Sequence, residues 1–168
     1  FLSLEVLMEN QFFAQNETEI ITSDITLKMS GLDFMMKIYK GELPLANIAK
    51  ILNFKLSSVE IGSVCFEGSP TNDHYNISGG IHGSWYGGLL DSAMACSILT
   101  TLSQGFTTTT LEYKINIIRP LKVGMLIEAR GITKHNGRST GIATGSIFGK
   151  NDGKLYATGS TTCLILEL

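Results

Sequence analysis

Hydrophobic side chains change their spacing several times along the chain, and each spacing predicts an element. Between Leu32 and Tyr39 they recur at helical intervals, and Ser30 supplies the hydroxyl that is typical of a helix start. We expect Gly41 to end this helix and Pro44 to open a second short one. Residues 30–52 are therefore predicted to hold two helices.

From Phe54 onward the pattern becomes that of strands, with β-branched and aromatic residues between turn residues. Gly62 separates two short runs, which predicts an early hairpin. Asn136-Gly137 and Asp152-Gly153 are strong hairpin turns between the longer runs of the second half. We expect strands at 54–59, 63–67, 107–120, 125–135, 138–148 and 155–166, the last four forming a meander.

A glycine-rich loop separates the two sets of strands, and a long pattern of small apolar residues follows it from about Gly83 to Leu102. This pattern predicts a buried helix. Together with the strands it indicates an α+β fold, in which an antiparallel sheet packs against one buried helix.

One charged residue stands out in this helix. From residue 77 to residue 111 the only formally charged side chain is Asp91. Burying an unpaired carboxylate is costly, so its presence needs a reason. The side chain can face solvent, or it can accept hydrogen bonds from Ser84 or Ser92. Alternatively it belongs to a functional site, as buried ionisable groups often do.

Composition fits one domain without nucleic-acid or membrane partners. The 168 residues carry a net charge of −2 and no basic run. Phe1–Met8 is apolar, but Glu5 interrupts it and no basic segment precedes it, so it is a poor signal peptide. The three cysteines follow no metal-ligand or disulfide pattern, and we interpret them as reduced, buried residues. We therefore expect a cytoplasmic protein.

The loop and the helix together supply parts of a hydrolytic site. Gly79, Gly80 and Gly83 let backbone approach a ligand closely, and a helix that starts near Gly83 points free N–H groups at that ligand. Such donors and a carboxylate base at Asp91 are two components of a hydrolase. Eight residues of helix separate them by about 12 Å, so they do not easily converge within one chain. Either one has no catalytic role, or two copies share the site.

At these residues the chain resembles a known family. The loop Asn76–His82, the following Gly-Ser-Trp and the sequence Leu-Leu-Asp-Ser-Ala-Met at 89–94 are similar to the signature of hotdog-fold acyl-CoA thioesterases. The similarity is to the phenylacetyl-CoA thioesterase type of the 4-hydroxybenzoyl-CoA thioesterase superfamily. In that family an antiparallel sheet wraps one long helix, and two chains build two active sites at their interface. The resemblance covers about residues 30–168, which implies a single hotdog domain after an uncertain N-terminal helical extension at 1–29.

The resemblance implies roles for the residues of the reaction. The Gly83 N–H would polarise the thioester carbonyl and hold the oxyanion, and Asn76 would orient that carbonyl or the attacking water. Asp91 of the other chain would act as general base or as nucleophile. Thr110 would bind the same water, or Thr109 if the register is shifted by one; β-propensity alone explains both threonines equally well. The products would be a free acid and coenzyme A, with no cofactor or metal beyond the coenzyme A of the substrate.

Substrate contacts are expected around the start of the helix. His82 is assigned a positioning role there, beside Ser84, where relatives usually carry a second glycine. Trp85 is expected either to border the acyl pocket or to pack in the dimer. His74, next to Asp73 in a turn, is interpreted as a solvent-exposed residue.

Coenzyme A also needs cations for its phosphates. The resemblance points to the hairpin tip at Asn136-Gly137, where Lys134, Gly137, Arg138 and Ser139 would contact the pantetheine and the nucleotide. A basic hairpin tip is also commonly just solvated.

Two other functions remain open on the same fold. A hotdog dehydratase or hydratase would need a His and an acid converging on a β-hydroxyacyl chain, and no second candidate His lies near Asp91. A non-catalytic acyl-CoA-binding protein would lack the acid of the helix. In each case a long edge strand and the buried helix indicate at least a homodimer, and we expect a tetramer or hexamer of such dimers.

Overall fold

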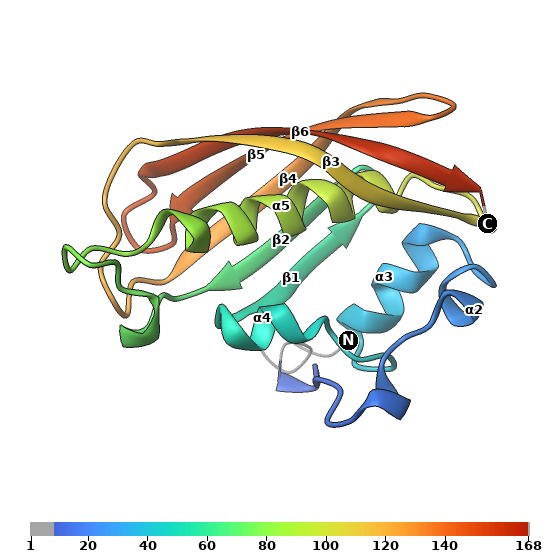
Figure 1. Cartoon of the computed structure of the whole chain (residues 1–168), viewed down its shortest axis with the longest axis horizontal. Coiled ribbons are helices and arrows are strands. Elements are labelled where there is room, and N and C mark those ends of the chain that lie inside the picture. Colours follow the sequence, from blue (N-terminus) through green and yellow to red (C-terminus); the bar gives the residue numbers. More distant parts are fainter. Residues whose placement is uncertain (1–8, 168) are drawn as a thin grey trace.

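A computed structural model of the chain describes residues 9–167 (Figure 1). Within this range six strands form one antiparallel sheet in the order β1-β2-β4-β5-β6-β3. No helix in the described range is long and apolar enough to cross a membrane. The strands are β1 (Phe54–Glu60), β2 (Ser63–Gly68), β3 (Phe106–Ile117), β4 (Ile127–Asn136), β5 (Thr140–Gly149) and β6 (Leu155–Glu167).

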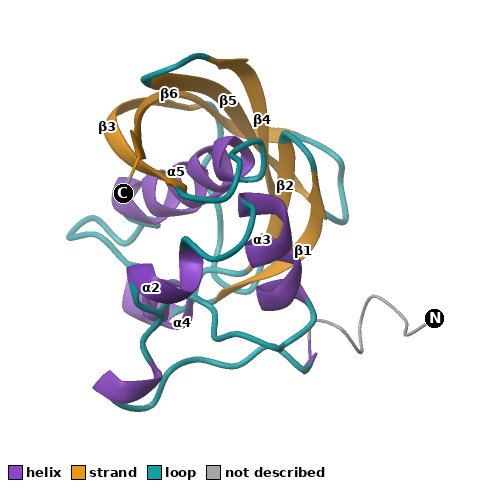
Figure 2. Cartoon of the chain, turned by 90° about the vertical axis from the view of Figure 1, so that its right-hand side faces the viewer, coloured by secondary structure: helices purple, strands orange, loops and turns teal. Residues whose placement is uncertain are grey.

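The long helix α5 (Gly83–Leu99) lies in the concave side of the sheet, which curls around it (Figure 2). Leu89, Leu90 and Met94 of this helix are fully buried. Gly131 of β4 permits the close approach of sheet and helix, because a Cβ there would overlap the Ala93 carbonyl. The predicted α+β fold, an antiparallel sheet wrapped around one long helix, is confirmed.

Short helices cover the side of α5 that the sheet leaves open (Figure 2). The predicted helix start at Ser30 is confirmed, since its hydroxyl accepts a hydrogen bond of 3.1 Å from the Asp33 N–H. The short helices are η1 (Glu17–Glu19), α2 (Ser23–Thr26), α3 (Gly31–Tyr39) and α4 (Asn47–Ile51); a further short segment, η2 (Asn72–His74), precedes α5.

The second predicted helix begins later than the sequence suggested. It starts at Asn47 rather than at Pro44. The Leu45 N–H donates to the Phe12 carbonyl at 2.8 Å, and this bond to the N-terminal segment holds the chain extended for three more residues. Ile48 of this helix is half exposed.

The strands lie where they were predicted, but the expected four-strand meander is wrong. β4, β5 and β6 do follow one another through the two predicted hairpins. β3, however, pairs with β6, and β4 pairs with β2 of the early hairpin. A sheet that encloses a helix places β3 at the edge opposite β1, and β-propensity along a strand carries no information on its neighbour.

β3 forms one open edge of this sheet. Three of its apolar side chains, Leu111, Tyr113 and Ile117, are about half exposed. A β-bulge between Thr110 and Glu112 interrupts its register with β6. A twelve-residue edge with exposed apolar side chains is a typical site for pairing with another chain.

Candidate active site

The carboxylate of Asp91 is partly buried in the middle of α5 and faces β3. Its Oδ1 accepts a hydrogen bond of 2.8 Å from the Thr110 hydroxyl. Neither serine considered as a partner bonds it: the Ser92 hydroxyl donates to the Gly88 carbonyl, and the Ser84 hydroxyl contacts the His82 ring. Asp91 is therefore paired across to the edge strand, at the boundary between the core and the open face of the helix.

The β-bulge of β3 defines which threonine reaches the helix. Thr110 pairs with Cys163 of β6, and the next paired residue is Glu112, so Leu111 is the extra residue. The buried hydroxyl of Thr161 donates to the Glu112 carbonyl at 2.7 Å and holds the strand immediately after the bulge. Thr109 is exposed, as expected for the alternate face of a strand. Of the two threonines, it is therefore Thr110 whose hydroxyl reaches Asp91.

The thiol of Cys96 does not offer a nucleophile. Burial raises the pKa of Cys96 to about 12, and the negative charge of Asp91 and then that of Cys163 add to this effect. A thiol with this pKa stays protonated at neutral pH, and only the thiolate attacks carbonyl groups. The Thr110 hydroxyl also lies 3.8 Å from the fully buried thiol of Cys163, so the partly buried carboxylate of Asp91 is the group beside it that a substrate can reach.

The start of α5 presents a free donor. His82 is the N-cap residue, and its Nδ1 accepts from the Ser84 N–H at 3.0 Å, so its ring is held against the first turn of the helix. The Gly83 N–H donates to none of the described residues. It lies at the positive end of a 17-residue helix, where a developing negative charge is stabilised.

The loop before α5 folds back so that Asn76 lies close to the helix start. Its Oδ1 accepts from the Ser78 and Gly80 N–H groups, at 2.9 and 3.0 Å, and this fixes a turn in which Gly79 has a φ of 78°. The side-chain amide of Asn76 donates to no residue in the described range. It is available to a ligand oxygen, whereas its carbonyl is used for the loop.

The predicted site residues form three separate groups along α5. One group is at its start (Asn76 to Ser84), the second is the Asp91–Thr110 pair near its middle, and the third is the β4–β5 hairpin near its end. Asn136 of this hairpin donates to the carbonyl of Thr101, just beyond the helix, at 3.4 Å. Lys134, Arg138 and Ser139 of this hairpin are exposed, and Gly137 between them is partly buried. One chain therefore does not bring the three groups together.

Two aromatic residues near the helix start lie elsewhere than expected. Trp85 is 1% exposed and donates its Nε1–H to the Leu52 carbonyl at 2.9 Å, so it is part of the core. The expectation that His74 is solvated is wrong, since the residue is buried. Its Nδ1 accepts from the Thr71 N–H, and its Nε2 then donates to the Ile51 carbonyl at 2.8 Å. These bonds tie the loop to the end of α4, so the ring supports Trp85 and is not a proton donor for a substrate.

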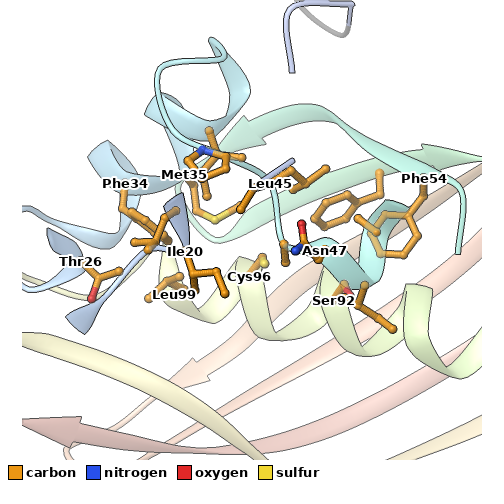
Figure 3. Close-up of a pocket in the computed structure, with 18 residues that line it drawn as sticks. Ile20, Thr26, Phe34, Met35, Leu45, Asn47, Phe54, Ser92, Cys96 and Leu99 are labelled. Atoms are coloured by element: carbon orange, nitrogen blue, oxygen red, sulfur yellow. The ribbon is translucent and has the colours of Figure 1, made fainter. Parts of the chain in front are cut away.

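A cavity that the sequence did not indicate lies against α5 and is lined by Ser92, the residue that follows Asp91. It has a volume of about 430 Å³ and lies between α5, the short helices and the first two strands (Figure 3). Six separate stretches of the chain supply its walls, and no periodic pattern in the sequence links them. Its side chains are considered below.

The sequence and the fold of this chain are similar to those of known proteins. Residues 78–156 match the sequence model of the Thioesterase superfamily. A Ralstonia eutropha protein described as a putative thioesterase related to phenylacetic acid degradation is 28% identical, with a TM-score of 0.70 over 78% of this chain and 98% of that one. The chain therefore has the hotdog fold, and its residues 78–156 are similar to the thioesterase superfamily.

Other hotdog structures agree with this fold. The PaaI protein of the Escherichia coli phenylacetic acid degradation operon is 22% identical, with a TM-score of 0.65 over 71% of this chain and 84% of that one. A Streptococcus mutans protein bound to acetyl-CoA is 24% identical, with a TM-score of 0.63 over 68% and 90%. No curated protein matches the sequence. The superfamily match and these hotdog neighbours support thioester hydrolysis as the general activity.

Proposed function

We propose that this chain hydrolyses acyl-CoA thioesters at a site shared between two copies. The observation that carries the proposal is the 2.8 Å hydrogen bond from Thr110 to Asp91, which fixes a carboxylate beside an open strand edge. That carboxylate is the only formally charged side chain between residues 77 and 111. A base held at a surface that another chain can cover has the properties of half a catalytic site.

In the proposed reaction Asp91 removes a proton from water, and the water oxygen adds to the thioester carbonyl carbon. The negative charge on the carbonyl oxygen is stabilised by the Gly83 N–H of the other copy, with the Asn76 amide as a second donor. The carbon–sulfur bond then breaks, and the coenzyme A sulfur takes up the proton. Attack by Asp91 itself, through an anhydride that water then hydrolyses, uses the same residues. Neither route needs a cofactor or metal.

The distance between Gly83 and Asp91 is the reason for proposing a site shared by two copies. Gly83 and Asp91 are separated by about 12 Å along one helix, more than a single carbonyl group can bridge. A second copy that pairs along β3 would bring its own helix start towards Asp91. The exposed Leu111, Tyr113 and Ile117 give that edge an apolar surface that pairing would cover. A homodimer is therefore the smallest active unit that we propose, and larger assemblies would be built from it.

The coenzyme A portion is proposed to lie against the β4–β5 hairpin. Lys134 and Arg138 are exposed cations at its tip, as phosphate groups require. This hairpin is at the opposite end of α5 from Gly83. In a shared site it would therefore act together with the helix start of the other copy. Bound acetyl-CoA in the Streptococcus mutans neighbour supports a coenzyme A ligand for this fold.

The test is release of free thiol from acetyl-, octanoyl-, palmitoyl- and phenylacetyl-CoA by the wild type and by Asp91→Asn. We expect turnover on at least one substrate, reduced by a factor of about 10²–10⁴ in the variant at unchanged dimer content. Binding of acyl-CoA without any thiol release by the wild type would contradict hydrolysis and indicate a non-catalytic binding protein. Hydration of an enoyl-CoA without thiol release would indicate a hydratase.

A further inference from the structure

The cavity beside α5 is long and uncharged. Ser92, Cys96 and Leu99 of the helix form one wall, and the opposite wall comes from the N-terminal segment, α3 and α4 (Figure 3). None of the described residues that line it carries a charge, and most of its surface is aliphatic or aromatic, as at Phe34 and Met35. Its volume of about 430 Å³ is in the range of sites that bind small molecules.

The cavity starts near Asp91 and runs along α5 away from it. Ser92 is the next residue along the helix, one hundred degrees further round, and it lines the end of the cavity nearest Asp91. On the helix surface between them lie only Gly88 and Ala95, which have little or no side chain. From Ser92 the wall runs past Cys96 to Leu99, about 10 Å along the helix axis.

We propose that this cavity receives the acyl group of the substrate, and that the group is a linear chain of medium length. The proposal rests on the proposed function, because it takes the thioester carbonyl to lie at Asp91. An extended chain advances by about 1.2 Å per bond, so 10 Å accommodates roughly eight carbons. The uncharged walls suit a saturated hydrocarbon, which gains free energy from each buried methylene.

The length of the cavity distinguishes a linear chain from an aromatic one. A phenylacetyl group would fill the end near Ser92 and leave the part beside Phe34 and Leu99 empty. An acetyl group would not enter it. The neutral thiol of Cys96, whose pKa burial raises to about 12, behaves in this wall as a small apolar group.

The first experiment measures binding without turnover. Calorimetry would compare acyl-CoAs of two to fourteen carbons with the Asp91→Asn variant, and with the wild type if it proves inactive. We expect affinity to rise about fourfold for each methylene up to roughly eight carbons and then to level off. Affinity that is independent of chain length, or highest for phenylacetyl-CoA, would overturn the proposal.

Two substitutions then test whether the acyl chain of the substrate occupies this cavity. Cys96→Leu adds bulk at its middle and should move the plateau to about four carbons, and Leu99→Trp fills the far end and should shorten it less. Cys65→Leu makes the same change at a buried cysteine outside the cavity, and it should leave the plateau in place. Thermal unfolding of each variant checks that it is folded. An unchanged plateau in folded Cys96→Leu would overturn the assignment.

The outcomes separate this proposal from the function it rests on. A plateau that moves with Cys96→Leu, together with no thiol release by the wild type, keeps the acyl cavity and removes hydrolysis. Thiol release that is indifferent to chain length in the wild type and in Cys96→Leu keeps hydrolysis and removes the acyl cavity.

Discussion

Replacing Thr110 by valine would remove the hydroxyl that donates to Asp91 and change little else. The two side chains are nearly equal in volume, and both suit a strand. The bond that is lost is short, at 2.8 Å, and its acceptor is a partly buried carboxylate. The backbone pairing of Thr110 with Cys163 does not depend on the hydroxyl.

A hydrogen bond to a charged group contributes about 1.5–3 kcal/mol. If the bond holds Asp91 in its reactive orientation, this range corresponds to a loss of roughly 10- to 150-fold in kcat. We expect KM to change little, because Thr110 is assigned no contact with the substrate itself. The assay is the initial rate of thiol release over a range of acyl-CoA concentrations, with urea denaturation to record the free energy of unfolding.

Thr109→Val is the matched control, since it makes the same change one residue away on the exposed face of β3. It should keep the wild-type kcat. Equal rates in Thr110→Val and Thr109→Val would refute the assignment of the hydroxyl. A double-mutant cycle with Asp91→Asn gives a further check, because Thr110→Val should cost almost nothing once the carboxylate is gone.

Three other outcomes rest on separate contacts. Iodoacetamide should alkylate Cys96 very slowly at neutral pH, because burial and the charge of Asp91 raise the pKa of its thiol to about 12. The pH dependence of alkylation, followed by mass spectrometry, should move to lower pH in Asp91→Asn. Identical pH profiles in the variant and the wild type would contradict this. Gly131→Ala should lower the free energy of unfolding, measured in urea, by about 3 kcal/mol, because the added Cβ overlaps the Ala93 carbonyl. An unchanged urea midpoint would mean that α5 and β4 move apart at no cost. Leu111→Lys should shift the mass measured by light scattering towards the monomer and abolish thiol release, and a fully active monomer would refute a shared site.

Elements with local signals were predictable from the sequence. The hydroxyl of Ser30 caps α3 as expected, because a cap depends only on residues within one turn. The hairpins at Asn136-Gly137 and Asp152-Gly153 are present for the same reason, although only Gly153 of the two glycines adopts a positive φ. In the first hairpin the Gly137 N–H donates to the Thr140 carbonyl.

Features that depend on distant residues were not predictable. His74 is buried because the Ile51 carbonyl accepts its Nε2–H, across 23 residues of sequence. The pairing of β3 with β6 follows from closing a sheet around α5, and strand propensity does not encode it. The late start of α4 depends on Phe12, which belongs to another segment.

The candidate site combines both kinds of information. Asp91 stands out in the sequence as a lone charge in an apolar helix, and Gly83 as part of a glycine-rich loop. The choice of Thr110 over Thr109 required the register of β3 and its bulge. The acyl cavity required the packing of N-terminal segments that share no motif with α5.

The shared site can be tested most directly by mixing two inactive variants. Asp91→Asn lacks the base. Gly83→Pro lacks the N–H donor, yet proline is favoured at the first position of a helix, and His82 already has the extended backbone that a following proline requires. A Cβ at Gly83 would make only ordinary contact with Ile117. Gly83→Ala, which keeps the N–H, is the control and should remain active.

Each variant alone should release thiol at less than about a hundredth of the wild-type rate. After the two are unfolded together and refolded in equal amounts, half of the dimers are mixed, and each mixed dimer has one intact site of two. Our account predicts recovery of about one quarter of the wild-type activity. No recovery in a mixture whose mixed dimers are verified by mass spectrometry would contradict a site built from Asp91 of one copy and Gly83 of the other.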